Sequence, residues 1–322
     1  MASTRRAAKP SSVLHPPSDL SDDVLRDALV ADWALDVASI EFAPVGFGSH
    51  HWHVVDRSGT RWFATVDRVE QPHRLEAALT TARVLRDAGL EFVAAPLRTT
   101  SGAVLVDVGS HHRMALYEFI DGESFRGMDY PSDEHRHGLL EMIVALHRAH
   151  APSSVLVDDF SIAHRDALDA IPDVGPYSTP TRDALGASER ALARIFARYA
   201  ELVEHAQADV RPRVVTHGET HTGNTMRTAQ GWVLVDWDTS LLAPPERDLW
   251  IPARGDDSIL DTYARATGTE VDPALLALYE LWWDLRDLCE YAHRFSRPHV
   301  GDGDDDKSWL GVTTVLERFE RS

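Results

Sequence analysis

The densest group of polar side chains in the sequence lies in the segment Thr216–Asn224, which reads Thr-His-Gly-Glu-Thr-His-Thr-Gly-Asn. A second polar pair, Asp236 and Asp238, follows the apolar stretch 233–235. A short hairpin between the two stretches would bring the side chains of Asn224 and Asp236 together. Such oxygen ligands suit Mg²⁺, which keeps bound water and takes its remaining ligands from substrate phosphates. The spacing therefore predicts a metal site at Asn224 and Asp236.

Glu219 lies five residues before Asn224, on the loop side of the same hairpin. A carboxylate in this place can accept a proton from a hydroxyl group that attacks phosphorus. The alternative is a polar hairpin whose Asp, Asn and Glu side chains only hydrogen-bond the loop. His217-Gly218 at the start, Gly-Asn at the end and Asp-x-Asp after one strand together favour a catalytic site.

At these residues the sequence resembles the aminoglycoside phosphotransferase family, antibiotic kinases that share a protein-kinase-like fold with choline kinase. The catalytic loop of the family has the pattern His-Gly-Asp-x-x-x-x-Asn, and its metal motif is an Asp after the next strand, often Asp-x-Asp. The residues that match in type and order are His217, Gly218, Asn224, Asp236 and Asp238. The resemblance also covers Asp248-Leu249 and runs from about residue 20 to the last residue.

The resemblance implies an α+β, bilobal protein-kinase-like fold with a small β-rich N-lobe and a helical C-lobe. It also implies Mg²⁺-dependent transfer of the γ-phosphoryl group of ATP or GTP to a hydroxyl of an antibiotic. An acceptor of the aminoglycoside or nucleoside type is expected, and its phosphorylation would give resistance. The residues implied in catalysis are Glu219, His217, Asn224 and Asp236, with Mg²⁺ held by the last two.

Two positions differ from the family pattern. The catalytic base of the family is Asp, whereas this chain has Glu219, whose extra methylene moves the carboxylate by more than about 1 Å. The nucleotide-binding lysine of the family lies on the third N-lobe strand, where this chain has Thr65. Only two of the 32 Lys and Arg residues are lysines, Lys9 and Lys307, and neither lies near that strand. Another group must therefore hold the phosphates.

The nucleotide is expected at a glycine segment between the first two predicted strands. Glycine lets the backbone approach a triphosphate, and the N–H groups of Ser49 and His50 would be donors. Arg61, Arg68, His50 or a second Mg²⁺ would replace the lysine, and Glu76 would lie at the surface or pair with Arg68. The base would meet the backbone of a hinge at residues 117–119. The predicted nucleotide-binding residues are Gly46, Gly48, Ser49, His50, Glu118, Phe119 and Asp238.

The acceptor pocket is expected on a late helix. Trp283, Asp287 and Glu290 recur at spacings of four and three, which places them on one helical stripe, and Asp284 lies close to it. In the resembled family this helix contributes to the acceptor pocket, and acidic groups there suit a cationic antibiotic. The alternative is a solvated charged face whose tryptophans pack inward.

The elements that position these residues change in type along the chain. Apolar alternation predicts strands over 39–45, 52–56, 61–66, 104–108 and 113–119, and helical spacing predicts a helix over 73–88. Further helices are predicted over 132–150, 188–207, 256–266, 273–295 and 307–319, with short strands over 213–216, 224–228 and 232–236. The acidic segment Asp302–Asp306 is expected to be a mobile loop. The predicted division is a disordered tail 1–18, a nucleotide-binding N-lobe 19–118 and a catalytic and acceptor-binding C-lobe 119–322.

The amino-acid composition limits the classes of molecule that the protein is expected to bind. The 322 residues suffice for two lobes, and the formal net charge of −19 disfavours nucleic acid and anionic lipid. The single cysteine, Cys289, cannot form an internal disulfide, which is typical of a reducing compartment and predicts a cytoplasmic protein. No apolar run approaches the ~18 residues of a membrane-spanning helix. The expected partners are a nucleoside triphosphate and a small-molecule acceptor, bound by a monomer or dimer, without nucleic acid or membrane.

A second interpretation is a catalytically weak, kinase-like binding protein that lost phosphate handling with its lysine and sequesters a ligand or partner. Asn224, Asp236 and Asp238 argue against it, because a protein that only sequesters has no physical need for a metal-binding pair. The sequence therefore favours a phosphotransferase.

Overall fold

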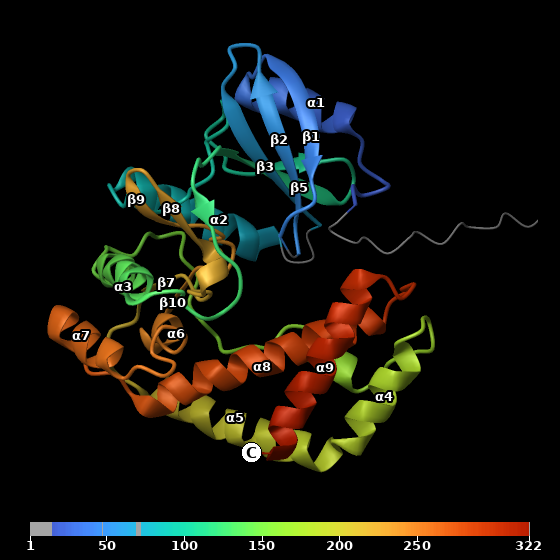
Figure 1. Ribbon diagram of the computed structural model, residues 1–322, viewed down its shortest axis with the longest axis vertical. Coiled ribbons are helices and arrows are strands. Elements are labelled where there is room, and N and C mark those ends of the chain that lie inside the picture. The colour runs from blue at the N-terminus through green and yellow to red at the C-terminus, as the bar shows by residue number, and fades with distance from the viewer. Residues whose placement is uncertain (1–14, 47, 69–71, 322) are drawn as a thin grey trace, which may run out of the picture. The chain divides into compact units, whose positions relative to one another are not determined.

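The computed structural model describes residues 15–46, 48–68 and 72–321 (Figure 1). The predicted disordered tail, residues 1–18, lies almost entirely outside them. The chain forms two compact units. The sheet unit contains the described residues up to Asp158 together with Val210–Asp272, and the helical unit contains Asp159–Asp209 and the residues from Pro273 onwards. The predicted boundary between residues 118 and 119 divides the chain differently and stays a prediction.

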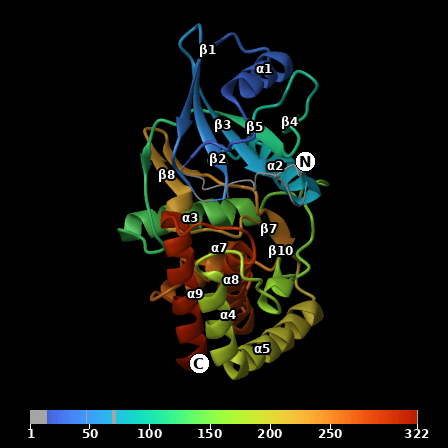
Figure 2. The same cartoon turned by 90° about the vertical axis from the view of Figure 1, so that its right-hand side faces the viewer.

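A five-stranded antiparallel sheet, in the order β1-β2-β3-β5-β4, forms the N-terminal part of the sheet unit (Figures 1 and 2). Its strands are β1 (Val37–Ala43), β2 (His50–Asp56), β3 (Arg61–Arg68), β4 (Val106–Val108) and β5 (His112–Glu118). All five predicted strands are confirmed, each within two residues at either end. The predicted combination of a β-rich N-terminal part with a helical C-terminal part is therefore confirmed.

The two faces of this sheet differ because side chains alternate along each strand. On the core face, Trp52 and Leu116 pack with Leu25 and Leu29 of helix α1 (Asp22–Trp33). Helix α2 (Pro72–Asp87) packs on the opposite face through Leu79, close to Ala115 of β5. That second face, here called the polar face, also carries His51, His53, Phe63, Thr65, Asp67 and Tyr117. It is the face on which the nucleotide-binding residues are discussed below.

The remaining elements of the sheet unit surround the polar segment Thr216–Asn224. Strand β7 precedes the segment and pairs with β10, and β8 follows it and pairs with β6 and β9. Their bounds are β6 (Glu123–Ser124), β7 (Val214–Thr216), β8 (Thr225–Thr228), β9 (Gly231–Leu234) and β10 (Leu241–Ala243). The helices are α3 (Asp133–His147), η2 (Thr222–Asn224), α6 (Glu246–Leu249) and α7 (Ser258–Thr267). The three predicted short strands are confirmed, although β9 ends at Leu234, so that Asp236 lies beyond its strand.

The helical unit is built around α8, which contacts α5, α9 and the short helix η1. Leu285, Leu288 and Phe295 recur at helical spacing and are buried, which gives α8 its apolar inner face. The elements are η1 (Arg165–Leu168), α4 (Ser178–Ala187), α5 (Glu189–Ala208), α8 (Pro273–Phe295) and α9 (Gly303–Arg321). Within the part of the chain that the structure describes, no helix combines the length and apolar character needed to cross a membrane.

The acidic segment Asp302–Asp306 forms the start of α9, so the prediction of a mobile loop is wrong. Oδ1 of Asp302 accepts hydrogen bonds from the N–H groups of Asp304 and Asp305, both at 3.0 Å, as an N-cap residue does. The Asp305 side chain is buried and accepts hydrogen bonds from the N–H groups of residues 300–302 and from Arg294 Nε at 2.7 Å. Carboxylates at a helix N-terminus are stabilising, which explains why this acidic run is ordered.

Candidate active site

Asp248 of α6 fixes the backbone where the polar segment begins. Its side chain is 0 % exposed, and its carboxylate accepts hydrogen bonds from the N–H groups of His217 (2.9 Å) and Gly218 (2.6 Å). Oδ2 also lies 3.1 Å from Nε2 of His147 on α3. Burial would raise the pKa of Asp248, but the hydrogen bond and charge of His147, with the charge of Arg247, hold it below its usual value. An ionised Asp248 therefore anchors the His-Gly pair.

Gly218 meets two requirements that only glycine satisfies. Its φ is +93°, in the left-handed region. A Cβ on this residue would lie 2.3 Å from the guanidinium group of Arg247. Arg247 is itself held by hydrogen bonds to Oγ1 of Thr216 and the carbonyl oxygen of Thr239, both at 2.9 Å. Backbone conformation and packing thus explain the glycine of the motif.

The His217 imidazole uses both ring nitrogens within the sheet unit. Nε2 lies 2.9 Å from the carbonyl oxygen of Val235 and donates there, and Nδ1 accepts the N–H of Glu219 at 3.2 Å. The ring packs edge-on against Trp237 at 4.8 Å. Burial lowers the pKa of His217 to about 4, against the smaller opposing effect of Asp248. The neutral ring positions the backbone of Glu219, and the catalytic role predicted for His217 stays a prediction.

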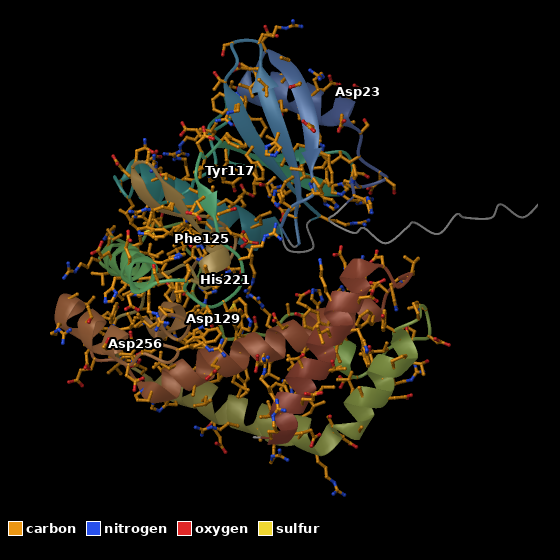
Figure 3. All side chains as sticks on the ribbon, viewed as in Figure 1. Asp23, Tyr117, Phe125, Asp129, His221 and Asp256 are labelled. Atoms are coloured by element: carbon orange, nitrogen blue, oxygen red, sulfur yellow. The ribbon has the colours of Figure 1, made fainter. Side chains whose placement is uncertain are left out.

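Asn224 links the end of the polar segment to Glu219. Its Nδ2 donates to the carbonyl oxygen of Glu219 at 3.0 Å, and its backbone N–H donates to the carbonyl oxygen of His221 at 3.0 Å. Nε2 of His221 lies 3.9 Å from Oε2 of Glu219. From outside the segment, the Asp129 carbonyl accepts the hydroxyl of Thr222 at 2.8 Å (His221 and Asp129 are labelled in Figure 3). The candidate base and the candidate metal ligand therefore belong to one hydrogen-bonded loop.

The hairpin of β8 and β9 brings Asn224 and Asp236 to adjoining positions. The last paired residues are Thr225 and Leu234, and beyond them the N–H of Val235 donates to the Asn224 carbonyl at 2.9 Å. Asp236 follows directly, with an exposed side chain and a φ of +67°. A positive φ is uncommon for a residue other than glycine and turns the chain away from the strand direction. The structure thus places the two predicted metal ligands at one end of the hairpin.

The donor set at this end fits a magnesium ion rather than a metal that needs a protein cage. No group of three or more His, Cys, Asp or Glu side chains suited to a metal occurs among the described residues. The hydrogen bond from Nδ2 commits the amide nitrogen of Asn224 to the loop, so the amide oxygen is the atom that it can offer to a cation. Asp236 adds an exposed carboxylate. Mg²⁺ typically takes only one or two such protein ligands and completes its shell with phosphate and water.

Tyr117 at the end of β5 lies within the electrostatic reach of three carboxylates. Burial raises its pKa well above the usual value, and the negative charges of Asp67, Asp236 and Asp238 add to the increase. Tyr117 belongs to the sheet and is labelled in Figure 3, whereas Asp236 and Asp238 follow β9. The predicted metal end of the hairpin and the polar face of the sheet therefore share one acidic environment.

The glycine segment before β2 is tied to that polar face. Gly46 and Gly48 have φ values of +83° and +92°, and Phe47 lies outside the described residues. The hydroxyl of Ser49 donates to Oδ1 of Asp67, whose pKa burial raises against this hydrogen bond. His50 is buried, and its ring lies 6.4 Å from that of Trp52 on the core face. The His50 side chain therefore does not belong to the polar face, and only its backbone can serve the predicted role.

Thr65, which stands where the resembled family has lysine, lies across from His51. Its Oγ1 is 3.3 Å from Nδ1 of His51. Glu76 of α2 pairs with Arg113 of β5 at 3.1 Å, rather than with Arg68 as one expectation had it. Arg68 is exposed at the end of β3.

The predicted hinge contains a cation–π contact. The N–H of Phe119 donates to the carbonyl oxygen of Arg61 at 3.3 Å, and the Arg61 guanidinium lies 4.2 Å from the centre of the Phe119 ring. Arg61 also forms an ion pair with Asp121. Glu118 is exposed and lies opposite Trp62 of β3. Arg61, one candidate for phosphate binding, is thus engaged at the hinge.

The four predicted acceptor residues lie on α8 in the helical unit, and each carboxylate has a basic neighbour there. Asp284 pairs with Arg318 of α9 at 2.5 Å, and burial raises its pKa. Asp287 lies 3.3 Å from Arg286, whose guanidinium covers the Trp283 ring at 4.3 Å. Glu290 lies 3.7 Å from His164. The stripe is therefore a network of paired charges, and its role in acceptor binding stays a prediction.

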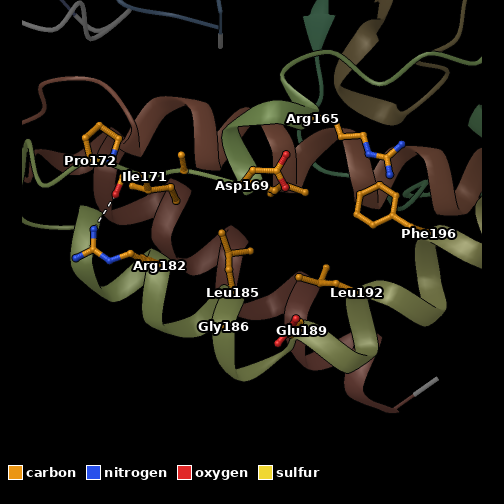
Figure 4. A pocket seen from close by; sticks show the side chains of 12 residues that line it. Arg165, Asp169, Ile171, Pro172, Arg182, Leu185, Gly186, Glu189, Leu192 and Phe196 are labelled. Atoms are coloured by element: carbon orange, nitrogen blue, oxygen red, sulfur yellow. Dashed lines mark hydrogen bonds between the residues drawn. The ribbon is translucent and has the colours of Figure 1, made fainter.

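A hollow of about 850 Å³ in the helical unit contains none of the predicted site residues (Figure 4). Its walls come from η1, α4, α5 and the chain between η1 and α4. Arg165 lies over the Phe196 ring at 4.3 Å, and Arg182 donates to the Ile171 carbonyl at 2.7 Å. Apolar side chains such as Leu185 and Leu192 line the rest.

On the polar face, the sequence assigned no role in the site to His51 or Asp67. Both face the polar side of the sheet next to predicted residues, since Asp67 lies two positions after Thr65 on β3 and His51 pairs with Thr65. The alternation along β3 could have identified Asp67. The register of β2 against β3 is needed to place His51.

Comparisons with known proteins show the family and the fold of the chain. Residues 39–291 match the phosphotransferase enzyme family. The chain is 26 % identical to protein StrN of Streptomyces griseus over 316 residues, which covers 92 % of each chain. A spectinomycin phosphotransferase in complex with ADP and spectinomycin is similar in structure, with a TM-score of 0.72 at 17 % identity over 95 % of this chain and 98 % of that one. An amicoumacin kinase in complex with AMP-PNP and Ca²⁺ has a TM-score of 0.65 at 13 % identity over 94 % of both chains.

Proposed function

Because this chain belongs to the phosphotransferase enzyme family, we propose that it transfers the γ-phosphoryl group of ATP or GTP to a hydroxyl of an antibiotic of the aminoglycoside or nucleoside type. The observation that carries the proposal is the loop in which Asn224 holds the carbonyl of Glu219 at 3.0 Å and adjoins Asp236 across the hairpin. This loop offers one proton acceptor and two oxygen ligands. The similar spectinomycin phosphotransferase and amicoumacin kinase, which bind nucleotide and antibiotic, support an antibiotic acceptor.

Glu219 is the proposed base. The acceptor hydroxyl oxygen forms a bond to the γ-phosphorus, the bond from that phosphorus to the bridging oxygen breaks, and the nucleoside diphosphate leaves with the electron pair. The hydroxyl proton passes to a carboxylate oxygen of Glu219. His217 and Asn224 hold the Glu219 backbone from two sides, at 3.2 and 3.0 Å. This support fixes the backbone from which the carboxylate extends, and positioning catalysis requires such a fixed base.

Asn224 and Asp236 are the residues that would hold Mg²⁺, with Asp238 close to the nucleotide. The bound ion would neutralise negative charge on the phosphates. The contribution of the chain itself is to fix the two ligands at the end of one hairpin, through the Val235 N–H bond to the Asn224 carbonyl at 2.9 Å.

The nucleotide is proposed to lie between the glycine segment and the hinge. Gly46, Gly48 and Ser49 would face the phosphates, and the backbones of Glu118 and Phe119 would face the base. The hydrogen bond from Ser49 to Asp67 supports this placement, because it fixes the glycine segment to the polar face. The acceptor is proposed to contact the α8 stripe Trp283, Asp284, Asp287 and Glu290.

The test combines binding and chemistry. Calorimetry with Mg-ATP and Mg-GTP measures nucleotide affinity, and mass spectrometry measures a phosphate added to members of an antibiotic panel. We expect nucleotide binding and one phosphorylated product, with the Asp236→Asn protein as the matched inactive control. Nucleotide that fails to bind at millimolar concentration would contradict the proposal and favour the sequestering protein instead. A structure with acceptor bound would then identify the hydroxyl group next to Glu219.

A further inference from the structure

The His51 imidazole lies between the glycine segment and Thr65. A Cβ on Gly46 would lie 2.8 Å from Nε2 of His51, so the ring packs directly against the Gly46 backbone. Nδ1 of the same ring is 3.3 Å from Oγ1 of Thr65, its partner across the β2–β3 pair. On the third side the ring stacks on Phe63, with centres 5.0 Å apart and planes inclined by 23°. His51 therefore presents a titratable nitrogen at the segment where the phosphates are proposed to bind.

Burial, with a smaller effect of the neighbouring histidines, keeps the His51 ring neutral before anything binds. Burial lowers the pKa of His51 to about 4, with smaller contributions from His50 and His53 of the same strand. From β3, Asp67 accepts the Ser49 hydroxyl. From β5, Tyr117 stays protonated at physiological pH because its pKa is raised. None of the five strands contains a lysine.

A bound triphosphate would change this balance. Its negative charge close to an imidazole favours the charged form, and an opposite charge within about 4–6 Å moves a pKa by ~1–3 units. Starting from about 4, the pKa of His51 would rise to between about 5 and 7. The ring would then gain its charge where a lysine would carry one permanently, and the unliganded protein avoids a buried cation without a partner.

We propose that His51 is the side chain that neutralises nucleotide phosphate on the polar face, and that it takes up a proton when a nucleoside triphosphate binds at Gly46. The inference rests on the proposed function, because it needs a nucleotide at the glycine segment. A group whose pKa rises on binding makes affinity increase as the pH falls. The proton uptake can therefore be measured in two ways: from the pH dependence of the binding affinity, and from the dependence of the binding enthalpy on the buffer.

The experiment is calorimetry of Mg-AMP-PNP binding, repeated in buffers of different ionisation enthalpy, between about pH 5.5 and 7.5. We expect the unaltered protein to take up a fraction of a proton and to bind about tenfold more tightly at the lower pH. In His51→Gln the uptake and the pH dependence should both be lost. The matched control is His53→Gln, two positions along β2 on the same face, which should keep both.

Three outcomes would count against the inference. Equal proton uptake by the unaltered protein and His51→Gln overturns it and leaves the proposed function intact. Nucleotide that binds none of the proteins overturns both. If thermal melting finds His51→Gln unfolded, histidine NMR of the unaltered protein decides instead, and a His51 pKa that AMP-PNP does not raise overturns the inference.

Discussion

The side-chain amide of Asn224 donates a hydrogen bond to the backbone carbonyl of Glu219 over 3.0 Å, so one residue serves both ends of the candidate site. The same Asn224 accepts the Val235 N–H through its own carbonyl at 2.9 Å. A change at the metal ligands and a change at the base are therefore coupled through a single residue.

Asp236→Asn should remove most of the turnover and leave the fold intact. The side chain is exposed, so the substitution removes a charge without disturbing the packing. Loss of a metal-binding carboxylate should lower kcat by about 10²–10⁴-fold, because charge neutralisation at phosphorus is worth several kcal/mol. Steady-state kinetics with the thermal melting curve measure both effects. Undiminished activity would refute the assignment, and the exposed Asp36→Asn should behave as the unaltered protein.

Glu219→Gln should lower kcat by about 10²–10⁴-fold with little change in the KM for nucleotide, because the amide keeps the size of the side chain but cannot accept the proton. Glu219→Asp should retain much more activity, or exceed the unaltered protein, since Asp is the base that the resembled family uses. Full activity of Glu219→Gln would mean that Glu219 acts through its shape rather than as a base.

Gly218→Ala should destabilise the sheet unit by about 2–5 kcal/mol, the sum of a strained left-handed residue and an overpacked contact with Arg247. Urea unfolding measures this cost. Gly59→Ala is the matched control, because Gly59 also has a positive φ, +87°, but its Cβ would meet nothing within 4 Å. It should lose only about 1–2 kcal/mol. Similar costs at both positions would exclude the predicted clash with Arg247.

The protein should lose stability as the pH falls from about 6.5 to about 4, because the pKa of buried His217 is about 4 when folded and near 6.5 when unfolded. The unfolded chain then binds more protons than the folded one, so protonation favours unfolding. The contribution of His217 reaches about 3 kcal/mol, and His51 acts in the same direction. Urea unfolding at several pH values should give a smaller slope for His217→Gln and an unchanged slope for the exposed His111→Gln.

Asp305→Asn should destabilise the helical unit by about 2–4 kcal/mol, because the buried carboxylate holds three backbone N–H groups and Arg294. Thermal unfolding followed by circular dichroism reports the loss. Glu317→Gln, at an exposed position on the same helix, should change stability by less than about 0.5 kcal/mol. A neutral result for Asp305→Asn would mean that α9 starts without help from this side chain.

Local patterns predicted those parts of the site that depend on short stretches of chain. The hairpin that joins Asn224 to Asp236 spans neighbouring strands, so spacing alone indicated it. The hydrogen bonds from the His-Gly pair to Asp248 join residues about 30 positions apart, and no local pattern indicates which atoms would meet. The contact between the His51 ring and the glycine segment depends on the register of β2 against β3. Register is a non-local property, so the sequence did not predict this contact.

Helix α1 and the start of helix α9 were also not predicted from local patterns. Helix α1 was not predicted, although Ser21 caps it and Leu25 and Leu29 recur at helical spacing, because the apolar stripe is short and the segment is rich in acid. The acidic run at residues 302–306 looked like a solvated loop because its partners, Arg294 and the backbone at 300–302, come from the preceding turn and helix. The pattern of charges along a sequence shows neither which groups an acidic side chain will bind nor whether that side chain will be buried.

Among the described residues, the helical unit is assembled from two stretches of chain, and the candidate catalytic residues lie between them in the sequence. During synthesis the last residue of the sheet unit, Asp272, is made before α8. Helix α5 is made earlier still, so it is present before α8, the helix that it contacts in the folded protein. The apolar side of α5, including Ile195 and Leu202, lacks its α8 partner during that interval, as do α4 and η1, which also contact α8. The order of translation therefore leaves these three helices with incomplete packing until α8 is made, and such exposed apolar surface favours misassembly.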